Sequence, residues 1–234
     1  MRTRLALVLM LVAAMSLAAT PDAAPAARSH SAAARGRDGA QGYAQYPLLG
    51  GRSFQSQLNV QECADDLMEL DEGDRITKVR WWGVVDSQGT PLPDFLITFY
   101  DHDPELGNPG DMLDSRLVKA SEVTAISDTT YEQIRYTTIL DPPFDHWEDI
   151  QLLWISIQAQ FAEQWWTWKW CEGDPLEGAG GLPAMYRTVG VDAWSKLPDN
   201  PEDDVRVDMS IVIWVEQPSA VEPSSWGVIK ALFR

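Results

Sequence analysis

The chain has 234 residues, with 35 acidic and 18 basic side chains and a formal net charge of −17. Five of the basic residues but only two of the acidic ones precede residue 46, so the negative excess lies in the rest of the chain. A surface with this charge repels phosphate groups, which argues against nucleic acid and anionic membranes as partners. Two explanations of the charge stay open: it keeps an exported protein soluble, or it binds cations.

The first residues have the pattern of a secretory signal peptide. Two arginines stand before an apolar run at residues 5–15, and small residues follow at 16–18. This order predicts a Sec-type signal peptide over residues 1–19. A helix that spans a bilayer needs ~20 apolar residues, so the run is too short for an anchor. We therefore expect a secreted or cell-surface protein with no transmembrane anchor in its mature chain.

Composition divides the rest of the chain into three parts. Residues 20–45 are rich in Ala, Pro, Gly, Ser and Arg and hold no large aliphatic side chain, which predicts a disordered leader. Residues 46–217 have the length of one domain. In the tail at 218–234, the stretch VEPSSWG looks like the opening of a Pro-Glu-Pro-type sorting tail, although the long apolar span is missing. A sorting or attachment segment and a plain tail both stay open.

Apolar and polar residues alternate along much of the domain, which predicts β-strands. The clearest strand is residues 205–216, whose apolar face holds Val205, Val207, Met209, Ile211, Ile213 and Val215. Further strands are predicted at 58–70, 75–85, 94–101, 114–123, 131–140 and 151–161. Turns rich in Gly, Pro, Asn and Asp separate them. The sequence therefore predicts an all-β fold, a single-domain antiparallel β-sandwich that is jelly-roll-like.

The chain has two cysteines, Cys63 and Cys171. In an exported protein two cysteines usually pair, so a disulfide between them is predicted, with two free buried thiols as the alternative. On the chain-entropy model, closing so long a loop stabilises the fold by roughly 4–5 kcal/mol. A thiol active site is not expected, because neither cysteine has a histidine nearby and there is no Cys-x-x-Cys motif.

Several segments, in this order, resemble a family of secreted bacterial β-sandwich modules. They are ADDLMELDEGDRITKVRWWGVV at 64–85, PDFLITFYDHDPELGNPGDML at 93–113, YEQIRYTTILDPPFD at 131–145, LLWISIQAQF at 152–161 and WWTWKW at 165–170. The resemblance implies an extracellular β-sandwich without an agreed catalytic activity, of a kind found in exported proteins with C-terminal sorting or anchoring tails. It bears on fold and location rather than on a specific function.

The turn YDHDPELGNPGD at 100–111 is the best candidate for a metal site. It gathers hard oxygen ligands of the kind that calcium prefers, namely Asp101, Asp103, Glu105, Asn108 and Asp111. An acidic, solvent-exposed turn between two strands is the alternative. No other cofactor is predicted from the sequence.

No catalytic motif stands out in the domain. Asp65 and Asp66 are adjacent, so on a strand they point to opposite faces and suit structural roles better than acid–base catalysis. His102 and His146 are the only histidines in the domain, and a zinc site usually needs three or four ligands. There is no nucleophile elbow and no Gly-rich phosphate loop. A pair of glycosidase carboxylates stays open, but we expect no enzyme.

The stretch EQWWTWKWCEG at 163–173 holds four of the eleven tryptophans. In an extended strand Trp166, Trp168 and Trp170 share one face, and Trp165 and Lys169 share the other. If the three rings are exposed, they form an apolar platform that stacks on sugar rings. If they face inward, they belong to the core of the sandwich. Both interpretations stay open.

These observations together predict a non-enzymatic extracellular module that serves surface structure or adhesion. A glycan or another cell-surface component is the expected partner. The alternative is a carbohydrate-binding module in which Trp166, Trp168 and Trp170 contact the sugar. The direction in which these three rings point separates the two hypotheses.

Overall fold

The computed structural model describes residues 39–68, 70, 73–86, 89–130, 132–145, 152–163, 165–174, 181–199 and 206–216. The predicted signal peptide, most of the predicted leader, His146 and the C-terminal tail lie outside these residues. The described residues belong to one compact unit. Within them, no helix is long and apolar enough to cross a membrane.

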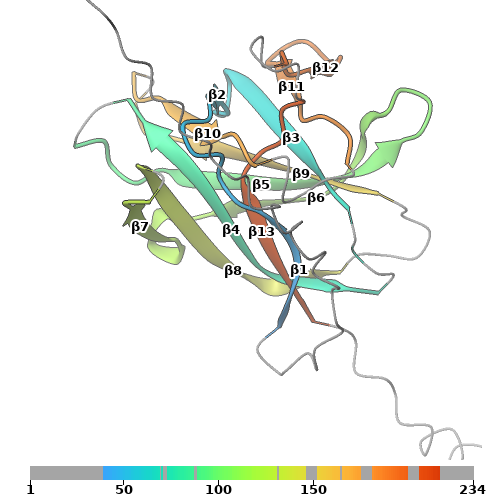
Figure 1. Cartoon of the computed structure of the whole chain (residues 1–234), viewed down its shortest axis with the longest axis horizontal. Coiled ribbons are helices and arrows are strands. Elements are labelled where there is room, and N and C mark those ends of the chain that lie inside the picture. Colours follow the sequence, from blue (N-terminus) through green and yellow to red (C-terminus); the bar gives the residue numbers. More distant parts are fainter. Residues whose placement is uncertain are drawn as a thin grey trace, which may run out of the picture. The chain divides into compact units, whose positions relative to one another are not determined.

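Two antiparallel β-sheets pack against each other, which confirms the predicted all-β sandwich (Figure 1). The first five strands are β1 (Ala40–Gln45), β2 (Ser53–Gln55), β3 (Gln61–Leu67), β4 (Arg75–Val85) and β5 (Asp94–Asp103). The next are β6 (Asn108–Val118), a 3-10 turn η1 (Ala120–Glu122), β7 (Thr124–Asp128), β8 (Gln133–Asp145) and β9 (Leu153–Gln160). The last are β10 (Trp168–Cys171), β11 (Met185–Thr188), β12 (Ser195–Lys196) and β13 (Ile211–Glu216).

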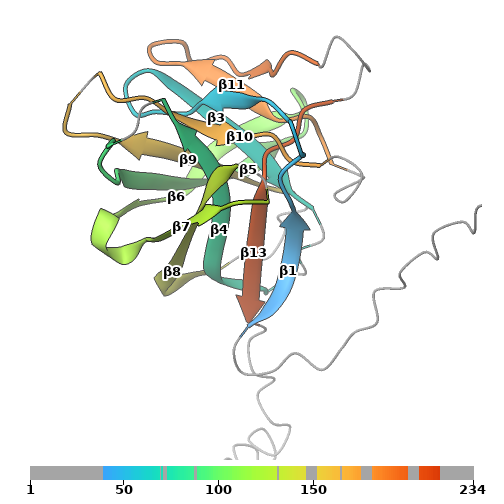
Figure 2. The same ribbon diagram turned by 60° about the vertical axis from the view of Figure 1, so that its left-hand side comes forward.

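Strand β4 is the centre of the seven-stranded sheet. It pairs with β8 along one edge, and with β13 and then β10 along the other. Strands β1 and β2 extend the sheet beyond β13 and β10, and β7 extends it beyond β8. Figure 2 shows β1 beside β13, with β4 next to them. The sheet thus joins the first and the last described strands of the chain.

The six-stranded sheet has the order β12-β11-β3-β9-β5-β6. Strand β9 lies near its middle, between β3 and β5, and seven of its eight residues are buried. Strand β6 ends the sheet on one side, and three successive residues near its middle are exposed. The two faces of this sheet differ, because successive side chains of a strand point to opposite sides.

Alternation along the strands directs apolar side chains into the space between the sheets. Burying apolar surface contributes roughly 25 cal/mol per Å² of area removed from water, so this core is the main source of stability. Its members include Ile76, Val79 and Trp81 from β4, Phe95, Ile97 and Phe99 from β5, Leu153, Ile155 and Ile157 from β9, and Ile211, Ile213 and Val215 from β13.

Residues 40–45 differ from the prediction. They were expected to end the disordered leader, but they form β1 and pair with β13. Pairing supplies hydrogen bonds to an edge that β13 would otherwise leave open, which outweighs the weak apolar content of the segment. The register shifts between Gln41 and Tyr43, around Gly42. A Cβ atom on Gly42 would lie 2.9 Å from a Val215 methyl, so the close contact favours glycine.

Several predicted strands have different bounds in the structure. The strand expected at 114–123 begins earlier and ends earlier, because residues 108–118 pair with β5 and a 3-10 turn follows. The strand expected at 205–216 is regular only over 211–216. Before residue 211, the backbone N–H of Met209 donates to the Asp65 carboxylate at 2.7 Å. A side chain thus accepts the hydrogen bond that the backbone of a neighbouring strand would otherwise accept.

Aromatic rings fill the interior around Gly83 of β4. The Phe95 ring lies with its edge toward Trp81 and Trp168, at centroid distances of 5.0 and 5.3 Å. The Trp168 indole lies directly on Gly83, where a Cβ atom would come within 2.4 Å of its Nε1. Any side chain at position 83 must therefore displace this ring from the core.

Gly83→Ala should lower the free energy of unfolding by about 1–3 kcal/mol, because the added methyl overpacks the core against Trp168. Trp168→Leu removes the ring that the methyl meets. The double substitution should therefore cost less than the sum of the two single ones. Urea denaturation of the four proteins measures this coupling. Strictly additive losses would contradict the contact.

Candidate functional site

The tryptophans of residues 163–173 are divided between core and surface. Trp168 and Trp170 lie in β10 and have no exposed surface. Trp166 precedes the strand and is half-buried, while Trp165 is 71% exposed. The burial of two rings contradicts the predicted platform of three exposed rings and confirms core packing for those two. The physical reason is that β10 pairs with β2 and β4, which turns the rings toward the opposite sheet.

The predicted disulfide between Cys63 and Cys171 is wrong, because both thiols are free. Cys63 faces the core between the sheets, whereas Cys171 packs with Trp82 and Val212 on the outer face of the seven-stranded sheet. Along β10, Trp170 points inward, so the next residue must point outward. Burial raises the pKa of each thiol to about 12, which keeps both protonated.

The acidic turn closes the hairpin between β5 and β6. Asp103 Oδ1 accepts the backbone N–H groups of Glu105 and Leu106 at 2.9 and 3.1 Å, so it caps the turn. The Asp101 carboxylate lies against Gly110. Within the described part of the chain, no group of three or more His, Cys, Asp or Glu side chains has the arrangement of a metal site. Calcium binding by Asp101, Asp103, Glu105, Asn108 and Asp111 stays a prediction.

Asp65 and Asp66 leave β3 on opposite faces, as predicted from their adjacency, and both are buried. Asp65 faces inward and accepts the N–H of Met209, and Asp66 faces outward and accepts the N–H of Leu182. Asp65 Oδ1 and Asp66 Oδ2 have no hydrogen-bond partner among the described residues. Each aspartate therefore ties a neighbouring segment to β3 through one oxygen.

A third buried carboxylate, Asp208, lies close enough to act on both aspartates. Burial raises the pKa of Asp65 well above its usual value, and the charges of Asp208 and Asp66 raise it further. Burial also raises the pKa of Asp66 to about 6, although the Leu182 N–H opposes this. For Asp208, burial raises the pKa and Arg206, with its Nε 3.2 Å from Asp208 Oδ2, lowers it. At pH values just above the usual aspartate pKa, where exposed aspartates have lost their protons, the carboxyl groups of this cluster therefore keep theirs.

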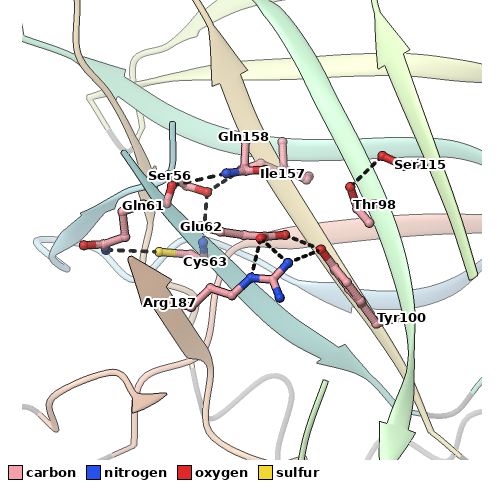
Figure 3. Close-up of polar contacts among 10 residues, drawn as sticks. All are labelled: Ser56, Gln61, Glu62, Cys63, Thr98, Tyr100, Ser115, Ile157, Gln158 and Arg187. Atoms are coloured by element: carbon pink, nitrogen blue, oxygen red, sulfur yellow. Dashed lines mark hydrogen bonds and ion pairs between the residues drawn. The ribbon is translucent and has the colours of Figure 1, made fainter. Parts of the chain in front are cut away.

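A hydrogen-bonded network lies on the outer face of the six-stranded sheet (Figure 3). Glu62 on β3 accepts the Tyr100 hydroxyl at 2.6 Å and the Arg187 Nε at 2.8 Å. Arg187 also donates to the Tyr100 hydroxyl at 3.0 Å, so the three groups form a closed triangle. The guanidinium carbon lies 4.4 Å from the centroid of the Trp194 ring, which covers it. The Glu62 carboxylate is thus neutralised and held in place.

Further polar groups of this sheet are paired across neighbouring strands (Figure 3). Thr98 and Ser115 share a hydrogen bond of 3.0 Å on the outer face. His102 accepts the Trp154 indole N–H at 3.3 Å, which assigns this histidine to packing on the sheet. Thr98, Ser115 and His102 are therefore each bonded to a side chain of a neighbouring strand.

The outer face of the seven-stranded sheet has a different chemistry. Lys78 Nζ lies 4.0 Å, and the Arg80 guanidinium carbon 4.8 Å, from the centroid of the Trp214 ring. Arg135 on β8 lies opposite Trp82, diagonally next to Arg80 on the same face. We call Lys78, Arg80 and Arg135 the basic face. The alternation of residues 75–85 indicates that Lys78 and Arg80 share one face. No sequence pattern indicated that Arg135 of β8 lies beside them.

A cavity of about 440 Å³ opens beside the basic face, where β8 runs past the end of β7. Lys78 and Thr137 line it from the basic face, and Thr124 and Ile139 lie around them. Arg116 reaches it from β6 of the other sheet and donates to the Pro143 carbonyl at 3.3 Å. The cavity thus combines hydroxyl, charged and apolar groups at one side of the sandwich.

No protein-family model, curated protein or solved structure matches this chain. The resemblance to secreted bacterial β-sandwich modules therefore remains a prediction from the motifs alone. The site residues that sequence reasoning missed, Glu62, Arg187 and Arg135, had no motif to mark them. Glu62 and Arg187 come together through the pairing of β3 with β11. Arg135 joins the basic face through the pairing of β4 with β8.

The free energy of unfolding should fall as the pH rises from about 4 through 6. A carboxyl whose pKa is raised in the folded protein keeps its proton there after the unfolded chain has released it, so its stabilising effect is complete at low pH and is lost above the folded pKa. For Asp66, whose folded pKa is about 6, the loss is on the order of 2 kcal/mol.

Urea denaturation at a series of pH values, on the protein and on Asp66→Asn, measures this effect. The amide does not titrate, so the variant should lose less stability over the same pH range. Asp111→Asn, which alters an exposed carboxylate, serves as the control and should follow the unchanged protein. Equal slopes for the protein and Asp66→Asn would contradict the raised pKa.

Proposed function

We propose that this chain is an exported, non-enzymatic β-sandwich module that serves surface structure or adhesion. The proposal commits to a contact role because Glu62, Tyr100 and Arg187 on the six-stranded sheet are bonded to one another in a closed triangle. A rigid sandwich with locked polar groups is suited to contact rather than to turnover.

Export is supported by the order of charged, apolar and small residues over 1–19. The strongly acidic composition, with a formal net charge of −17, supports solubility after export. The motifs shared with secreted β-sandwich modules point in the same direction. A cell-surface component is the partner class that these features favour.

The observation that carries the adhesive role is the apolar surface of the edge strand β6. Met112, Leu113 and Leu117 are 63%, 38% and 43% exposed on this strand, which ends the six-stranded sheet. An edge strand offers unpaired backbone groups, and exposed apolar side chains beside them favour pairing with another chain. Ile126 on β7, an edge strand of the other sheet, is also exposed.

Bacterial cells that export the full chain should attach to one another faster than cells without it, and charges on the edge strand should reduce this. Met112→Lys together with Leu117→Lys should remove most of the gain, because lysines on an edge oppose strand pairing. Val191→Lys, at an exposed apolar residue of the loop after β11, is the matched control. Sedimentation of cell suspensions and fractionation of the cells measure attachment and export.

Two results would overturn the proposal. Retention of the chain in the cytoplasm with its first 19 residues uncleaved would remove the exported role. The edge variant could also sediment as fast as the unchanged protein at equal surface amounts, which would remove the role of β6.

A further inference from the structure

Three basic side chains, those of Lys78, Arg80 and Arg135, gather on one face of a protein whose formal net charge is −17. Arg80 and Arg135 lie on neighbouring strands, and within the described residues neither forms an ion pair with a carboxylate. Burial lowers the pKa of Arg80, and the charge of Arg135 lowers it further. The charge of Asp128 offsets part of this repulsion, and the Trp82 indole N–H holds that carboxylate at 3.0 Å. An anion between the two guanidinium groups would relieve their repulsion.

Two side chains of the basic face, those of Arg80 and Lys78, are held in position before any ligand arrives. Arg80 Nε donates to Thr137 Oγ1 at 3.2 Å, and its guanidinium also lies over the Trp214 ring. Lys78 lies over the same ring. Fixed side chains lose less conformational freedom on binding, which favours affinity.

The cavity beside the basic face supplies the groups that recognise hydroxyls. Thr137 links the basic face to the cavity, because its hydroxyl accepts the Arg80 Nε–H and it also lines the cavity. Thr124 lies opposite Thr137 on β7, and the carboxylates of Glu122 and Asp141 lie in the same lining as acceptors. A volume of about 440 Å³ lies within the usual range of small-ligand sites. The ligand that fits both parts carries an acidic group and several hydroxyls.

We propose that the outer face of the seven-stranded sheet binds an acidic saccharide, with its carboxylate or sulfate on Arg80 and Arg135 and its hydroxyls in the cavity beside Lys78 and Thr137. An acidic polypeptide would satisfy the guanidinium groups but would leave the hydroxyls and carboxylates of the cavity without matching partners. The inference goes beyond the proposed adhesive role and does not depend on β6, so failure of the edge variants would leave it intact.

The test is the binding of soluble polymers to the purified protein by titration calorimetry. Polygalacturonate carries carboxylates, dextran sulfate carries sulfates, dextran is the neutral control and polyglutamate is an acidic polypeptide. We expect binding to at least one acidic polysaccharide, weakened by added salt, and none to dextran. Arg135→Gln should raise the Kd about tenfold, the equivalent of one charge-assisted contact, and Arg80→Gln in addition should raise it further.

Lys196→Gln is the matched control, because it removes a positive charge from β12 of the other sheet and should leave the Kd unchanged. If Arg80→Gln lowers the melting temperature, Arg135→Gln alone decides, because the Arg135 side chain forms no ion pair or hydrogen bond with the described residues. Absence of binding to both acidic polysaccharides, or binding that Arg135→Gln leaves unchanged, would overturn the inference. Equal affinity for polyglutamate would overturn the saccharide in favour of an acidic polypeptide.

Discussion

The indole rings of Trp168 and Trp170 project from a four-residue strand into the space between the two sheets. Trp168 packs on Gly83 of the central strand β4 and on Phe95 of the opposite sheet, so a single ring connects both layers. The Trp170 indole N–H donates to the Ser210 carbonyl at 2.9 Å, which secures the chain just before β13. Because these rings must point inward, the register of the neighbouring strands is fixed around them.

The same constraint determines what the two outer faces carry. A strand that points its tryptophans inward points Lys169 and Cys171 outward, and Cys171 packs there against Trp82. That face also holds Arg80 and Arg135, which leaves a cationic surface on an acidic protein. The other sheet carries the closed network around Glu62 on its outer face. The two outer faces thus differ: one carries a closed polar network around Glu62, and the other carries the basic face.

Most of the fold followed from alternation, because a half-buried strand has to alternate. Residues 75–85 form β4 with the predicted bounds, and its alternation turns Val79 and Trp81 toward the core. Residues 40–45 were missed, because their strand depends on pairing with β13 rather than on their own composition. The disulfide was wrong because it was inferred from cysteine count and compartment, without reference to the face on which each thiol lies. Only part of the basic face was predictable from the sequence, namely Lys78 and Arg80 on one strand. Arg135 joins them only through the pairing of β8 with β4.

The direct test of this account is the state of the two cysteines in protein that has been secreted and purified without reductant. The strand alternation that buries Trp168 and Trp170 sends Cys171 to the outer face, away from Cys63. Ellman titration should therefore detect two thiols per chain after denaturation in urea and almost none in the folded protein, where burial raises the pKa of both to about 12. No reactive thiol after denaturation, with a mass lower by two hydrogens, would show a disulfide and contradict the inward direction of the two rings.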